Sequence, residues 1–205
     1  METFGTPFSI VGCTMKKKEK KMYTLLLLLI YLAFISLGLP DSLLGSAWPV
    51  MHKAFQVPLS YAGLVTMIIS VGTICSSLMS ERLTKKFGTQ IVTVFSVMLT
   101  AIALFGFSTA SAFWMLCLWA VPYGLGAGAI DAALNNYVAL HYNSRHMSWL
   151  HCFWGLGTII SPYVMSYALT TSVWQNGYRM VSFIQIGITL ILFVTLPIWK
   201  VNKKE

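Results

Sequence analysis

Long apolar runs alternate with short polar segments along the whole chain. Six runs are long enough to cross a bilayer, because a helix needs about 20 apolar residues to span the hydrocarbon core. No long irregular stretch separates them, so we expect one all-α membrane domain over residues 22–199, between tails of residues 1–21 and 200–205. The predicted transmembrane helices are Met22–Met51, Leu59–Ser80, Gln90–Ser108, Ala112–His141, Met147–Thr171 and Arg179–Trp199.

Composition supports a lipid environment. Apolar residues make up 57% of the chain and charged residues only 10%, whereas a soluble domain carries about 25% charged residues. The net charge of +8 does not indicate a nucleic-acid partner, because the basic residues lie in short clusters between apolar runs rather than along one folded face.

The basic clusters predict the orientation. Twelve of the fourteen Lys and Arg residues lie before the first span, between the second and third, after the fourth, or after the sixth. Only Lys53 and Arg179 lie on the other side. The positive-inside rule therefore places both termini in the cytoplasm, with the chain in a cell membrane.

The amino terminus has a second interpretation. Lysines followed by the apolar run Leu25–Ile30 are typical of a signal peptide. No small-residue cleavage site follows, however, and the run continues past Asp41 to Val50, which favours an uncleaved span. Residues 1–14 have no strong character, and a misassigned leader or a short disordered tail both fit them.

Cysteine spacing indicates no metal site and no disulfide. The residues Cys13, Cys75, Cys117 and Cys152 are scattered, and no pair has CxxC or metal-ligand spacing. We expect small apolar fillers, no bound metal and no cofactor.

A weak duplication relates the first and second spans to the fourth and fifth. Gly38-Leu-Pro-Asp resembles Gly128-Ala-Ile-Asp at an offset of 90, and Gly72-Thr-Ile-Cys-Ser resembles Gly157-Thr-Ile-Ile-Ser at an offset of 85. A repeated three-helix unit must be inverted, because three crossings bring the chain to the opposite side. Inverted repeats are typical of secondary transporters, which bind solute at the repeat interface.

Asp41 and Asp131 are the acidic residues that lie within the predicted spans. A charged residue at the centre of a membrane helix costs at least about 2.5–3.5 kcal/mol. A role in binding solute or a coupling ion is therefore favoured over the alternative, a carboxyl that only caps or pairs with a neighbouring helix.

Small and polar residues share a helical face with each aspartate. Tight helix packing explains the glycines but not the carboxylates and amides. His151 lies near the cytoplasmic end of the fifth span, where snorkelling and a cavity role are both open. The other candidates for solute or ion binding are Gly38, Asp41, Gly45, Trp48, Gly128, Asp131, Asn135 and Asn136.

These residues resemble the major facilitator superfamily, and within it the fucose permease-like sugar transporters. The resemblance covers about residues 22–199, and the runs that carry it are Gly38–Pro49, Gly124–Asn136 and Leu150–Gly157. It implies a proton- or sodium-coupled sugar carrier in which Asp41 serves coupling or sugar binding, with Asp131 as the acidic partner.

The loop between the second and third spans matches the family's signature in part. Leu83, Lys86 and Gly88 fit, whereas Glu81 and Lys85 stand where Gly and Asp are usual. The family associates gating salt bridges with that aspartate, which this chain lacks at the matching position, and a plain basic cytoplasmic loop also accounts for much of this run.

Family members have twelve helices, so six correspond to the amino-terminal half. A fragment, a truncated product and one subunit of a split or dimeric carrier all fit. Half a cavity needs a second six-helix half or a second copy to cover its polar face.

Two other functions stay open: a remnant that does not transport, and an efflux carrier. An enzyme is disfavoured, because the sequence contains no GxSxG or HExxH motif. No catalytic residue is therefore expected.

Overall fold

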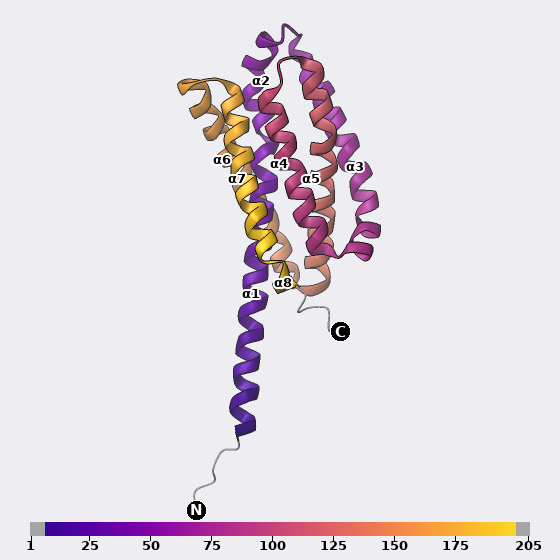
Figure 1. Cartoon of the computed structure of the whole chain (residues 1–205), viewed down its shortest axis with the longest axis vertical. Coiled ribbons are helices and arrows are strands. Elements are labelled where there is room, and N and C mark those ends of the chain that lie inside the picture. The colour runs from indigo at the N-terminus through magenta and orange to yellow at the C-terminus, as the bar shows by residue number, and fades with distance from the viewer. Residues whose placement is uncertain (1–6, 200–205) are drawn as a thin grey trace, which may run out of the picture.

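The computed structural model describes residues 7–199, with side chains from residue 22 onward, and within these residues it contains helices and no strand (Figure 1). Helix α1 begins at Pro7, inside the segment that we assigned to the tail, and residues 1–6 and 200–205 lie outside the described part. The elements are α1 (Pro7–Asp41), α2 (Leu43–Ala54), the 3-10 turn η1 (Leu59–Tyr61), α3 (Ala62–Phe87), α4 (Thr89–Thr109), α5 (Phe113–His141), α6 (Ser144–Thr171), α7 (Trp174–Val194) and α8 (Leu196–Trp199).

Six spans long and apolar enough to cross a membrane occur among the described residues, as predicted. The first, Met22–Ala54, combines α1 and α2. The sixth span begins at Trp174 rather than Arg179. Its first turn contains polar residues, which is why the sequence pattern excluded it, but tertiary contacts keep this turn helical. Trp174 packs edge-on against Phe55, with ring centroids 5.5 Å apart, and is buried.

The helices form one bundle, in which the span of α4 is the most buried, followed by those of α1 with α2 and of α5. Helix α3 packs along α5, α6 along α1, and α4 against α5 and α7. The start of α1 extends beyond the other helices at the end where α8 also lies (Figure 1). The chain order puts Arg82, Lys85, Lys86 and Arg145 at this end, which we call the basic end.

Glycines pair the helices closely and reveal the repeat. Where α1 meets α6, a Cβ on Gly38 would clash with the backbone carbonyl of Trp154. Where α3 meets α5, a Cβ on Gly124 would clash in the same way with the backbone carbonyl of Ile69. Ile69 and Trp154 are 85 residues apart, and Gly38 and Gly124 are 86 apart, so the two interfaces are equivalent.

This packing shifts the alignment of the repeats by one helical turn. The sequence match paired Gly38 with Gly128 at an offset of 90, but the interface pairs Gly38 with Gly124. On the packing alignment, the equivalent of Asp41 is Ala127, not Asp131. The two carboxylates are therefore not related by the repeat symmetry, although α1 and α5, which carry them, are equivalent helices of the two repeats.

A proline explains one buried polar contact at the centre of the bundle. Pro40 has no N–H to donate to the carbonyl of Ser36, four residues earlier. Gln185 of α7 donates its Nε2 to that oxygen at 2.6 Å, and its Oε1 accepts from the hydroxyl of Thr100 at 3.0 Å. The buried amide thus satisfies a backbone group that the proline leaves free.

The same solution recurs at the break between α1 and α2. Pro162 leaves the carbonyl of Thr158 without its usual donor. The hydroxyl of Ser42, the residue at the break, donates to that oxygen at 2.7 Å. The break therefore lies against the freed carbonyl of α6.

Candidate solute-binding site

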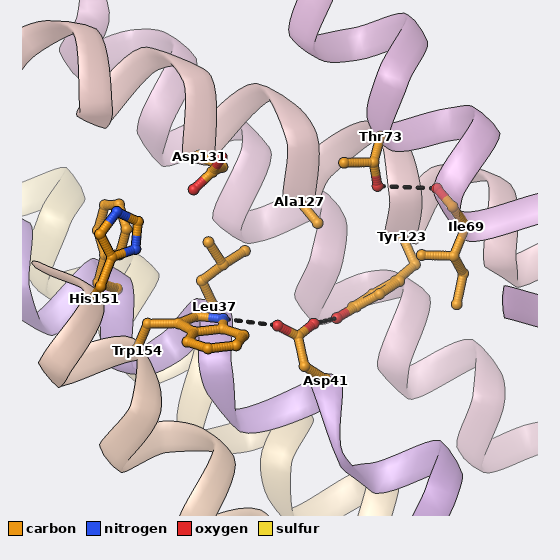
Figure 2. A pocket seen from close by; sticks show the side chains of 10 residues that line it. Leu37, Asp41, Ile69, Thr73, Tyr123, Ala127, Asp131, His151 and Trp154 are labelled. Carbon is orange, nitrogen blue, oxygen red and sulfur yellow. Dashed lines mark hydrogen bonds between the residues drawn. The ribbon is translucent and has the colours of Figure 1, made fainter.

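A cavity of about 310 Å³ opens between α1, α3, α5 and α6, within the size range of small-molecule sites. Asp41 and Asp131 both line it, as Figure 2 shows. Both side chains are candidate site residues by sequence, and the fold brings them into one cavity. The full lining is Phe34, Leu37, Asp41, Ile69, Thr73, Tyr123, Ala127, Asp131, His151 and Trp154.

Asp41 is the last residue of α1, and two other helices hold its carboxylate. The hydroxyl of Tyr123 on α5 donates to Oδ1 at 2.9 Å, and the indole Nε1 of Trp154 on α6 donates to Oδ2 at 2.8 Å. Figure 2 shows the carboxylate between the two rings. Because an indole N–H can only donate, Asp41 must accept with Oδ2.

Asp131 lies two helical turns beyond Tyr123 on α5. Its Oδ1 accepts a hydrogen bond from Nδ2 of Asn135, one turn further along the same helix, at 2.9 Å. His151 of α6 lines the cavity with it, and the two side chains lie on the same side of the cavity in Figure 2. Unlike Asp41, Asp131 accepts no hydrogen bond from another helix among the described residues.

The remaining lining is apolar and aromatic. Phe34 packs edge-on against His151, with ring centroids 6.2 Å apart, while Leu37 and Ile69 supply aliphatic surface. A mostly apolar lining with a few convergent polar groups is typical of a site that binds and orients a small molecule. No group of three His, Cys, Asp or Glu side chains that could hold a metal occurs among the described residues.

Trp48, a predicted site residue, lies away from this cavity. Its ring is buried, with centroids 6.2 Å from Phe113, and its Nε1 donates to the carbonyl of Leu59 at 2.7 Å. The prediction treated the first span as one continuous helix with one face. The helix breaks at Ser42, so α2 does not continue the face that carries Asp41.

The glycines and Asn136 also lie outside the cavity lining. Gly38 and Gly128 are packing positions, since a Cβ on Gly128 would clash with the backbone of Thr73, whereas a Cβ on Gly45 would meet open space. Asn136 lines a second cavity of about 460 Å³ between α3, α4 and α5, together with Glu81.

The three signature residues of the loop between α3 and α4 have structural roles in the fold. Gly88 adopts φ +88°, a conformation that favours glycine, and its N–H donates to the carbonyl of Thr84 at 2.9 Å. Lys86 places its ammonium 5.2 Å from the ring centroid of Phe87. Leu83 packs against the small cluster of Val92, Ala129 and Ala133.

Sequence reasoning missed Tyr123 and Trp154 as site residues. Two spacings contained the signal: Tyr123 and Asp131 are eight residues apart on α5, and His151 and Trp154 are three apart on α6. Such spacings place side chains on one helical face. The direction of each face toward the cavity depends on how the helices pack.

Comparisons with known proteins show a family and relatives that the chain resembles. The model of the Major Facilitator Superfamily matches residues 30–205. The chain is 23% identical over 163 residues to "Bypass of stop codon protein 6" of Saccharomyces cerevisiae, covering 78% of this chain and 33% of that protein. It is 22% identical over 152 residues to the "Glucose/mannose transporter GlcP" of Bacillus subtilis, covering 72% and 37%. The chain thus spans about a third of the length of these relatives.

Proposed function

The chain belongs to the Major Facilitator Superfamily, and we propose that it forms the amino-terminal six-helix half of an ion-coupled carrier for a small polar solute. The observation that supports this best is the cavity itself. It brings two intramembrane carboxylates, Asp41 and Asp131, together at the interface of the inverted repeats, where secondary transporters bind solute.

A hexose is the solute that we propose. The carboxylates of Asp41 and Asp131 can accept hydrogen bonds from sugar hydroxyls, and the rings of Phe34, Tyr123 and Trp154 offer apolar surface to the ring carbons. The likeness to a bacterial glucose/mannose transporter supports the same solute class. This proposal also includes membership of the fucose permease-like group and transport by symport. It places the chain in a cell membrane with both termini in the cytoplasm.

One wall of the cavity is missing in the six-helix bundle. Trp154 is 38% exposed, and Asp41 and His151 are exposed as well, so one wall of the site is open. Polar groups cannot face lipid at this depth without cost. We propose that a second six-helix half, or a second copy of the chain, closes this wall and completes the carrier.

The test is binding and exchange of D-glucose and D-mannose. The purified chain, together with any subunits that copurify with it, is placed in nanodiscs for binding and in liposomes for exchange. Asp41→Asn and Asp131→Asn should each weaken binding at least about tenfold, since hydrogen bonds to charged groups contribute about 1.5–3 kcal/mol. Glu81→Gln, at a carboxylate outside the cavity, is the matched control.

Two results would contradict the proposal. Unchanged binding in both aspartate variants would remove the site assignment. Absence of binding and exchange in the wild type, even with copurified subunits, would favour a remnant that folds and associates without transporting.

A further inference from the structure

The two carboxylates of the cavity differ in the hydrogen-bond donors that the protein supplies to them. Asp41 has one donor on each oxygen, from Tyr123 at 2.9 Å and from Trp154 at 2.8 Å. Among the described residues, Asp131 has a single donor, the Nδ2 of Asn135, which reaches its Oδ1 at 2.9 Å. In Figure 2 its carboxylate stands apart from the three residues that are joined at Asp41. The second oxygen of Asp131 is therefore left for a donor from outside the described chain.

Acceptors outnumber donors around Asp131. Oδ1 of Asn135 is buried and accepts no hydrogen bond within the part of the chain that the structure describes. His151, which lines the cavity and packs edge-on against Phe34, supplies at most one donor as a neutral imidazole. An acceptor-rich end of a site suits a ligand group with several donors, and a protonated amine carries three.

No fixed cation of the described chain lies beside this carboxylate. Neither lysine nor arginine occurs in the lining of the cavity among the described residues. Between residues 22 and 199, the basic side chains lie within about two turns of a helix end, and they are Lys53, Arg82, Lys85, Lys86, Arg145 and Arg179. An ionised carboxylate in a low-dielectric site without a cation is costly. A solute that brings its own positive charge lowers that cost.

We propose that the preferred solute of the cavity is a hexosamine, a hexose that carries a protonated amine, with its ammonium group at Asp131 and its hydroxyls at Asp41. This inference rests on the proposed function, because it narrows the hexose of the same cavity to one class. It also gives the two aspartates different roles: Asp131 reads the charge of the solute, and Asp41 reads its hydroxyl groups.

The donors already present decide which aspartate takes the ammonium. Each oxygen of Asp41 already accepts from a neutral donor, so the remaining lone pairs are enough for hydroxyls but not for a group with three N–H donors. Oδ2 of Asp131 can accept a charge-assisted hydrogen bond without displacing a protein donor. Binding forms and breaks no covalent bond.

The aromatic part of the lining is compatible with a cationic solute. The rings of Phe34, Tyr123 and Trp154 all line the cavity. The face of an aromatic ring attracts cations, and the attraction increases when the cation loses its water. The same rings offer apolar surface to the carbons of the sugar, so a charged amine and a hexose ring can use one lining.

The first test compares three sugars on the wild-type chain with its copurified subunits in nanodiscs at pH 7. The sugars are D-glucosamine, D-glucose and N-acetyl-D-glucosamine, which keeps the nitrogen and loses the charge. D-glucosamine should bind at least about tenfold more tightly than either neutral sugar, because hydrogen bonds between charged groups are roughly twice as strong as neutral ones.

The possible failures of this comparison are distinct. Equal affinities for D-glucosamine and D-glucose would overturn the inference alone, since they would show that a group other than the solute neutralises Asp131. Absence of binding by all three sugars would overturn the proposed function as well.

The second test locates the ammonium group. Asp131→Asn removes the charge at nearly constant shape, so the advantage of D-glucosamine over D-glucose should disappear, whereas Asp131→Glu keeps the charge and should keep the advantage. Asp41→Asn should weaken binding of both sugars to a similar degree. Glu81→Gln, outside the cavity, is the control and should change neither affinity. An advantage that survives in Asp131→Asn, or that only Asp41→Asn removes, would overturn the inference.

Discussion

Asp41 shows how one residue joins three helices of a membrane protein. A lone carboxylate in a span is costly, and here a phenol from α5 and an indole from α6 offset that cost at 2.9 and 2.8 Å. These bonds also set the side-chain position, because both oxygens are occupied. A solute that binds Asp41 must therefore use lone pairs that Tyr123 and Trp154 leave free, or displace one of them.

Replacing Trp154 by phenylalanine tests this arrangement. Trp154→Phe keeps an aromatic ring but removes the donor to Oδ2, so Tyr123 alone then holds the Asp41 carboxylate. We expect D-glucose binding to weaken roughly tenfold or more, since a hydrogen bond to a charged group contributes about 1.5–3 kcal/mol. Equilibrium binding in nanodiscs measures the change. The matched control is Trp114→Phe, at a ring 65% exposed, and an equal loss there would contradict the role of Trp154.

At the scale of elements, the contact between α1 and α6 depends on glycine. A Cβ on Gly38 would lie within 3.2 Å of backbone atoms of Trp154 and Thr158, and backbone cannot move aside as a flexible side chain can. The pair α3 and α5 uses Gly124 and Gly72 for the same purpose. Small residues thus set the helix separation in both repeats.

Alanine at Gly38 should destabilise the bundle. Overpacking costs about 1–3 kcal/mol, so Gly38→Ala should lower the midpoint of thermal unfolding by about 2 °C or more. Gly45→Ala provides the control, because its Cβ would meet open space and alanine favours the helix. Unfolding of the purified chain in detergent measures both. Equal midpoints for the two variants would exclude close packing at Gly38.

The buried amide of Gln185 offers a second test at this scale. It joins α7 to the carbonyl of Ser36 on α1 and to Thr100 on α4, and only 1% of its surface is exposed. Gln185→Leu should destabilise the chain by about 1–2 kcal/mol, the range for polar contacts between membrane helices. A double-mutant cycle with Thr100→Val should show non-additive losses. Additive losses would mean that the two side chains do not stabilise each other.

For the whole molecule, the distribution of charge predicts the orientation. The basic end contains Arg82, Lys85, Lys86 and Arg145, and should face the cytoplasm. In a chain whose native cysteines are replaced by serine, Lys53→Cys should react with an impermeant maleimide in intact cells. Lys86→Cys should react only after the cells are opened. The reverse pattern would place the termini outside.

The spans and the two intramembrane carboxylates could be read from sequence, because both depend on local properties. A bilayer demands an uninterrupted apolar length from each helix, whatever its neighbours, and an aspartate inside such a run is visible without a structure. The inverted repeat was visible too, although the weak motif match placed its alignment one helical turn away from the packing alignment.

Tertiary structure decided which residues surround those carboxylates. Trp154 and Tyr123 join Asp41 because α6 and α5 rotate those faces toward it, and rotation about a helix axis follows from packing across the bundle. Trp48 lies outside the site because α1 ends at Asp41 and α2 begins at Leu43, and its Nε1 donates to the carbonyl of Leu59. The hydroxyl of Ser42, at that break, donates to the carbonyl of Thr158 that Pro162 leaves free on α6. The sequence by itself predicted six spans with two aspartates inside them, and six helices long and apolar enough to cross a membrane occur among the described residues. Only the packing of those helices made one aspartate a held acceptor and left the other beside a histidine.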